Sequence, residues 1–137
     1  MCMSYGNVYV AQIALGANRI QALKAIQEAE AYNGPSIIIA YSPCIAHGFD
    51  MMKTQLEQKR AVDCGYWALY RYNPTLEKPF TWETKDPQGN FQEFIKGERR
   101  YTALYKTAPK EADLLFQEAE KDAKRRLGFF KKMGDIM

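Results

Sequence analysis

Two apolar runs separated by one amphipathic segment constrain the fold of this chain more than any other feature. The first run, "NVYVAQIAL" (residues 7–15), is rich in β-branched and aromatic residues, and the second, "SIIIAY" (residues 36–41), has the same character. Neither run alternates between apolar and polar positions. Short runs of this kind predict strands that are covered on both faces, as in a parallel sheet.

The segment between the two runs carries the signals of a helix. Gly16 ends the first run, and Asn18 followed by Gln21 three residues later is typical of a capping box. The sequence "NGP" (residues 33–35) predicts the end of the helix. We expect a wide apolar face on this helix, made by its alanines together with Ile20, Leu23 and Ile26.

A second helix and a third strand are expected next. Residues 50–63 predict a weaker helix around Met52, Leu56 and Val62, ended by Gly65, and "YWALYRYN" (residues 66–73) predicts a strand. Strand, helix, strand, helix and strand at this spacing indicate a βαβαβ unit. We therefore predict an α/β fold with parallel strands and right-handed crossovers.

The chain changes character after Asn73. The connector "NPTLEKP" precedes "FTWET", which predicts a short edge strand, and Asn90 with Glu93 then predicts the start of a helix. Pro109 suits the first turn of a last helix. We expect an α/β unit over residues 1–74 and a mostly helical C-terminal extension over residues 75–137 that packs on it.

Composition excludes several classes of protein. With 137 residues, 47% of them hydrophobic, the chain can bury a core of its own, and a net charge of +3 gives no reason to expect a nucleic-acid partner. No apolar run approaches the roughly 20 residues needed to span a bilayer. The first residues lack the features of a signal peptide, so we expect a cytoplasmic protein with no membrane partner. Glycine-rich phosphate-binding motifs are also absent.

The candidate site lies in "YSPCIAHG" (residues 41–48), directly after the second predicted strand. Ligands of open parallel sheets bind just outside the carboxyl ends of the strands, where Cys44 is expected to lie. Pro43 stiffens the approach and Gly48 permits a tight turn. The N-terminus of the next helix would favour the thiolate form of Cys44, which is the form that binds metal.

Other interpretations of these residues stay open on chemistry alone. A cysteine in a domain of this size is usually a small buried hydrophobe. On chemistry alone this interpretation is favoured for Cys44, and more strongly for Cys2 and Cys64. His47 could ligate a metal or act as a base, but more often such a residue only hydrogen-bonds its loop. A thiol enzyme that uses Cys44 with His47 ranks last, because the sequence offers no orienting acid near the pair. No residue is predicted to be catalytic.

The sequence resembles the late part of the pyruvate:ferredoxin (flavodoxin) oxidoreductase family over nearly the whole chain. The resemblance is densest over residues 3–48 and 65–74, and it continues in order through "KPFTWETKDP", "FQEFIKGERRYTALYK" and "PKEADLLFQEAE". A colinear match of this length is much more specific than any short motif. It implies half of a thiamine diphosphate-binding fold followed by the helical extension.

The resemblance also implies a chemistry for the longer enzyme. Members of the family convert pyruvate and coenzyme A to acetyl-CoA and CO2, using thiamine diphosphate with Mg²⁺, and pass electrons through 4Fe–4S clusters to ferredoxin or flavodoxin. The cysteine of the family's Y-[SA]-x-C-I motif is the fourth ligand of the cluster nearest to the thiamine, and here that position is Cys44. A 4Fe–4S cluster needs four ligands of this kind.

The sequence departs from the family in ways that predict a fragment. The thiamine motif and the other three cluster cysteines lie upstream in the family, and "MCMSYG" begins within a family motif. We therefore expect the 137 residues alone to be inactive and to bind neither cofactor, with the remainder of the parent enzyme as partner and a homodimer when complete. An alternative is a stand-alone interaction or adaptor domain that has lost the catalytic parts.

Overall fold

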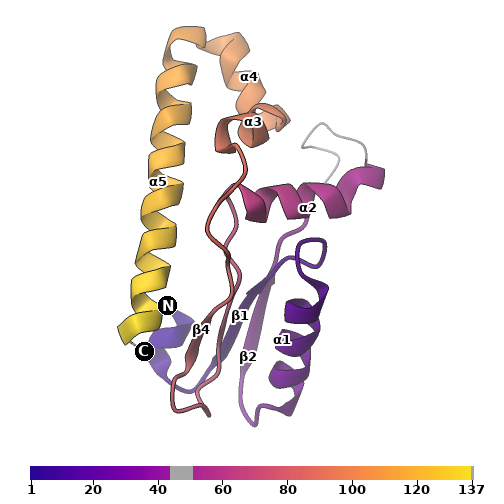
Figure 1. Ribbon diagram of the computed structural model, residues 1–137, viewed down its shortest axis with the longest axis vertical. Helices are drawn as coiled ribbons and strands as arrows, with labels where there is room; N and C mark the ends of the chain where they lie inside the picture. The colour runs from indigo at the N-terminus through magenta and orange to yellow at the C-terminus, as the bar shows by residue number, and fades with distance from the viewer. Residues whose placement is uncertain (44–50, 137) are drawn as a thin grey trace.

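The computed structural model of the chain describes residues 1–43 and 51–136. Its strands and helices follow one another in an order that begins with a parallel β–α–β unit and ends in a long helix (Figure 1). The strands are β1 (Tyr9–Ile13), β2 (Ser36–Ala40), β3 (Tyr70–Tyr72) and β4 (Phe80–Trp82). The helices are α1 (Arg19–Ala31), α2 (Thr54–Asp63), α3 (Phe91–Lys96), α4 (Arg99–Thr107) and α5 (Pro109–Ile136), with short 3-10 helices at Cys2–Tyr5 and Met51–Lys53.

The four strands form one mixed sheet in the order β2-β1-β3-β4. Strands β1 and β2 are parallel, with Tyr9 opposite Ser36 and Ile13 opposite Ala40. Strand β3 runs antiparallel to β1, and β4 runs antiparallel to β3. The α/β class, the parallel unit of β1, α1 and β2, and the mostly helical C-terminal part are confirmed. The prediction that the third strand is parallel is wrong.

The position of α2 explains why β3 runs antiparallel. A parallel crossover must carry the chain back to the edge of the sheet where the strands begin. Helix α2 instead lies across the carboxyl ends of β1 and β2 (Figure 1), and Gly65, with a φ of +85°, turns the chain at that same edge. The Trp67 indole donates a hydrogen bond of 3.0 Å to the carbonyl of Ile13, at the end of β1. The next strand can therefore only run away from this edge.

The two faces of the sheet are covered by different helices. Helix α1 packs on one face, where its alanines meet Tyr9, Ala11 and Ile13 of β1. Helix α5 runs along the other side of the sheet, beside β4, and its Leu127 joins a second cluster with Val8 and Val10 (Figure 1). Strand β1 is thus buried on both faces, as its sequence predicts.

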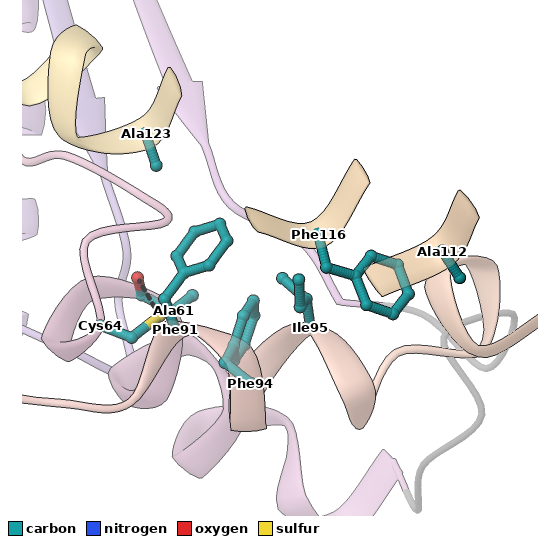
Figure 2. Close-up of a cluster of buried hydrophobic side chains, with 8 residues drawn as sticks. All are labelled: Ala61, Cys64, Phe91, Phe94, Ile95, Ala112, Phe116 and Ala123. Atoms are coloured by element: carbon teal, nitrogen blue, oxygen red, sulfur yellow. Dashed lines mark hydrogen bonds between the residues drawn. The ribbon is translucent and has the colours of Figure 1, made fainter. Parts of the chain in front are cut away.

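A further core lies where the helical C-terminal part packs against the end of α2 (Figure 2). Phe91, Phe94 and Ile95 of α3 point towards Phe116 of α5, and the end of α2 completes the cluster. The start of α3 is confirmed, because the Asn90 side chain accepts a hydrogen bond from the backbone N–H of Glu93 at 3.2 Å. Pro109 begins α5 as expected.

The burial of α1 and β2 differs from the prediction. Asn18 caps α1 by accepting a hydrogen bond from the N–H of Gln21, but the helix buries mainly its small side chains, such as Ala22 and Ala25. Strand β2 was expected to be covered on both faces, yet four of its five residues are exposed. Apart from Ile38, the large aliphatic residues of both elements are exposed to solvent: Ile20, Leu23, Ile26, Ile37 and Ile39.

Candidate functional site

The two residues singled out by the sequence, Cys44 and His47, lie outside the residues that the structure describes. The chain that leads to them is described up to Pro43. The N–H of Tyr41 donates a hydrogen bond of 3.1 Å to the carbonyl of Ile13, so the chain stays attached to β1 for one residue beyond β2. Pro43 is buried. The last described residue before Cys44 is therefore fixed at the carboxyl edge of the parallel strands.

A group of aromatic side chains surrounds this departure point. The Tyr41 ring lies 5.3 Å from the ring of Trp67 and 6.3 Å, edge-on, from that of Tyr66. The hydroxyl of Tyr66 is 3.3 Å from that of Tyr101 in α4. The three tyrosines thus connect the end of β2 to the helical C-terminal part.

Two buried carboxyl groups lie against these tyrosines. Glu57 of α2 and Glu98, the residue before α4, are only 5% and 4% exposed, and their side chains are hydrogen-bonded to each other. Burial, followed by the charge of Glu57, raises the pKa of Glu98 to about 7. Two adjacent negative charges in a buried site repel each other and raise the free energy of the folded chain. Glu98 therefore keeps a proton at pH values where an exposed glutamate is ionised.

The phenols beside this pair are held in their neutral form. Burial, and then the charge of Glu98, raises the pKa of Tyr41 far above its usual value. Burial and the hydrogen bond with Tyr101 do the same to the pKa of Tyr66. Arg60 is the cation that pairs with Glu57, at 3.3 Å, from the rim of the cluster. The carboxyl–tyrosine cluster, defined as Glu57, Glu98, Tyr41, Tyr66 and Tyr101, can therefore store a proton near neutral pH.

A close approach of backbone segments fixes α2 above the end of β1. The side chain of Gln58 accepts a hydrogen bond of 2.7 Å from the N–H of Gly16. A Cβ atom on Gly16 would lie 2.4 Å from the carbonyl oxygen of Gln55, so only glycine fits here. Because Glu57 lies between these two glutamines, the same contact positions the buried carboxyl.

The described cysteines lie in apolar surroundings. Cys64 ends α2, lies in the helical core and donates a hydrogen bond of 3.5 Å to the carbonyl of Ala61 (Figure 2). Burial raises the pKa of its thiol to about 11, which opposes the thiolate that a metal requires. Cys2 packs beside the cluster of Val8 and Leu127. Across residues 1–43 and 51–136, no three His, Cys, Asp or Glu side chains form a group that could hold a metal ion.

Two open pockets flank the site. One, of about 420 Å³, lies between β1 and α5 and is lined by aromatic rings together with Asp122 and Arg126. Arg126 already donates a hydrogen bond to the carbonyl of Tyr66. The other, of about 330 Å³, lies beside Asn18 at the start of α1, and lysines and acidic residues line it together. This mixture of charges favours neither anions nor cations.

Sequence reasoning did not find the carboxyl–tyrosine cluster. Glu57 in α2 and Glu98, just before α4, lie far apart in the chain, and no local pattern marks either of them. Only the packing of α2 against the start of α4 brings them together. Among the described residues, every helix is too short or too polar to span a lipid bilayer.

Comparison with known proteins gives relatives that cover almost the whole chain. The pyruvate:ferredoxin oxidoreductase of Moorella thermoacetica is 52% identical over 98% of this chain, and the pyruvate-flavodoxin oxidoreductase of Enterobacter agglomerans is 52% identical over 97%. The mitochondrial NADP⁺-dependent pyruvate dehydrogenase of Euglena gracilis is 42% identical over 97%. No family model matches the sequence.

The match covers only a small part of each relative. The chain spans 12% of the Moorella and Enterobacter proteins and 8% of the Euglena protein. Identity of 41–52% along the full match nevertheless leaves no doubt about common ancestry. The chain is therefore homologous, over nearly its whole length, to one segment of the pyruvate:ferredoxin and pyruvate-flavodoxin oxidoreductases.

Proposed function

We propose that this chain acts as one segment of an enzyme that oxidatively decarboxylates pyruvate with coenzyme A and passes the electrons to ferredoxin or flavodoxin. The observation that carries the proposal is the identity of 41–52% to proteins named for this reaction, over nearly the whole chain. Its partners would be the rest of the longer polypeptide, a second copy of the complete enzyme, and the electron acceptor. The chain alone would be inactive.

The fold supports a placement within the longer enzyme. Parallel β1 and β2 joined by α1 form the type of α/β unit whose carboxyl edge binds ligands. We propose that this unit is half of the domain that binds thiamine diphosphate with Mg²⁺, with residues 75–137 as the helical extension. Neither half would bind the cofactor without the other.

Cys44 is proposed as one ligand of a 4Fe–4S cluster. The whole sequence holds three cysteines, one of them buried in the helical core, so the chain cannot supply the four ligands of such a cluster. The remaining ligands would come from other parts of the enzyme. A bound cluster would accept electrons singly and pass them on. The role of the described residues is to hold the chain beside Cys44: Tyr41 is attached to Ile13, and Pro43 is buried.

The proposal is tested by an exchange enzyme, in which this chain replaces the corresponding segment of the Moorella thermoacetica protein. We expect the exchange enzyme to reduce ferredoxin in the presence of pyruvate and coenzyme A, and the 137-residue chain alone to show no such activity. A correctly folded exchange enzyme without pyruvate-dependent reduction would overturn the proposed function. Anaerobic reconstitution of the chain alone should yield no stoichiometric iron.

A further inference from the structure

Among the described strands, none covers the outer edge of β2. Of these strands, β2 pairs with β1 alone and lies at the end of the sheet in the order β2-β1-β3-β4. The N–H of Tyr9 donates to the carbonyl of Pro35, and the N–H of Tyr41 donates to that of Ile13. In a parallel pair, successive residues of a strand direct their backbone N–H and C=O groups to opposite sides of that strand. The N–H and C=O groups of Ser36, Ile38 and Ala40 therefore point to the free edge, without a backbone partner among the described residues.

The composition of this edge is unusual for one that faces water. Exposed edge strands are normally protected by charged side chains, proline or a bulge. Strand β2 reads "SIIIA" and contains none of these. Ile37 and Ile39 are 40% and 41% exposed, although both belong to the type of run that is normally buried on both faces.

The exposed apolar groups lie on both sides of the free edge. Side chains alternate along a strand, and Ile38 packs against α1, so Ile37 and Ile39 point to the opposite face of the sheet. On the α1 side, Glu28 reaches across to Arg71 of β3, so that flank of the helix faces the middle of the sheet. Ile26 lies on the other flank, towards the free edge, with Leu23 beside it on the side away from the sheet, and both are exposed.

We propose that the free edge of β2 receives a further β-strand from the rest of the longer polypeptide. The surface concerned, named here the β2 edge surface, consists of this free edge together with Leu23, Ile26, Ile37 and Ile39. The inference rests on the proposed function. The relatives contain about eight times as much chain as the part matched here, so a covalently linked occupant exists in them at high effective concentration. A strand with helices on both of its faces would cover the edge and the four side chains together.

Hydrogen–deuterium exchange tests the proposal without changing the sequence. In the chain alone, the amides of Ser36, Ile38 and Ala40 should exchange quickly, because they have no backbone partner. In the exchange enzyme the same three amides should be protected, so the peptide that spans β2 should take up about three fewer deuterons at early times. The peptide that spans β1, which is paired on both sides, serves as the control and should behave alike in both proteins.

Substitution gives a second, independent test. The pair Ile37→Lys and Ile39→Lys should leave the thermal midpoint of the chain alone unchanged and lower that of the exchange enzyme. Ile37→Thr with Ile39→Thr keeps β-branched residues in the strand and should have the same selective effect. Leu114→Lys, on an exposed position of α5 away from this surface, is the matched control.

Each outcome decides the proposal. Equal early exchange of the β2 peptide in both proteins, or an exchange enzyme that tolerates the lysines as well as Leu114→Lys, would overturn it. A discrete dimer of the chain alone that the lysines dissociate, with no effect in the exchange enzyme, would assign the surface to a second copy and also overturn it. Loss of pyruvate-dependent reduction with protection of β2 intact would contradict the proposed function but not the surface.

Discussion

At the scale of single residues, Gly16 shows how one missing side chain sets the geometry of the site. The loop after β1 approaches α2 so closely that the backbone of Gln55 occupies the place of a side chain at position 16. The hydrogen bond from Gly16 to Gln58 depends on the same approach. The sequence predicts only that Gly16 ends a strand. The structure adds a second role, which is to allow the close contact between the loop after β1 and α2.

Gly16→Ala is therefore expected to destabilise the chain. A Cβ atom 2.4 Å from a backbone oxygen cannot be accommodated without moving α2, and overpacking of this kind costs about 1–3 kcal/mol. Gly128→Ala is the matched control, because that position lies in α5 with no atom within 4 Å of the added Cβ. Alanine is favoured over glycine in helices, so Gly128→Ala should stabilise by about 0.5–1 kcal/mol. Urea denaturation measures both, and equal stability of the two variants would contradict the account.

At the scale of elements, the carboxyl–tyrosine cluster joins α2 to the start of α4. Glu98 is the N-cap residue of α4, but its side chain makes no capping hydrogen bond and is bonded instead to Glu57 of α2. A proton between the two carboxyls makes this contact favourable, and its loss places two like charges together in a buried site. The contact between the two helices should therefore weaken as the pH rises.

The pH dependence of stability tests this contact. The pKa of Glu98 is near 4.5 when the chain is unfolded and about 7 when it is folded. The contribution of Glu98 is thus fully present below about pH 4.5 and is lost as the pH rises through about 7. Between about pH 4.5 and pH 7, the urea midpoint of the wild type should fall more steeply than that of Glu98→Gln. Glu118→Gln, on an exposed position of α5, should follow the wild type. Parallel profiles for the wild type and Glu98→Gln would contradict the raised pKa.

The elements that the sequence predicts are those with local signals. The apolar run of β1, the Asn18 cap of α1 and the Asn90 cap of α3 depend on neighbouring residues, and the structure confirms them. The direction of β3 depends instead on where α2 lies, and long-range contacts such as Trp67 to Ile13 decide that. No spacing in the sequence encodes such a contact.

Burial of β2 illustrates a different limit. Its sequence predicts a strand covered on both faces, but nothing in residues 1–43 and 51–136 covers the free edge. An apolar strand requires other parts of the protein to cover both of its faces. A chain that is homologous to one segment of longer proteins need not contain all of these covering parts. The same limit applies to the candidate site. The sequence motif and the family resemblance predict Cys44 as a site residue, whereas the Glu57–Glu98 pair is found only from the packing of the folded chain.

At the scale of the whole molecule, the features of the chain converge on the carboxyl edge of the parallel strands. Helix α2 lies across this edge, the aromatic side chains of Tyr41 and Trp67 pack beside it, and the chain leaves it at Pro43, immediately before Cys44 (Figure 1). The N-terminal segment lies near the end of α5, beside the sheet (Figure 1), where Cys2 and Met3 pack against the cluster that contains Leu127. The carboxyl edge of the parallel strands is where the proposed function places its chemistry.

The iron content of the exchange enzyme tests the central claim most directly. Cys44→Ser should remove one cluster, lowering the iron by about four atoms per polypeptide, while the other clusters keep theirs. Cys2→Ser is the control and should retain the full iron content, because Cys2 packs against the apolar cluster around Val8. Size-exclusion chromatography would verify that both variants remain assembled. An assembled Cys44→Ser enzyme with undiminished iron would contradict the assignment of Cys44 as a cluster ligand.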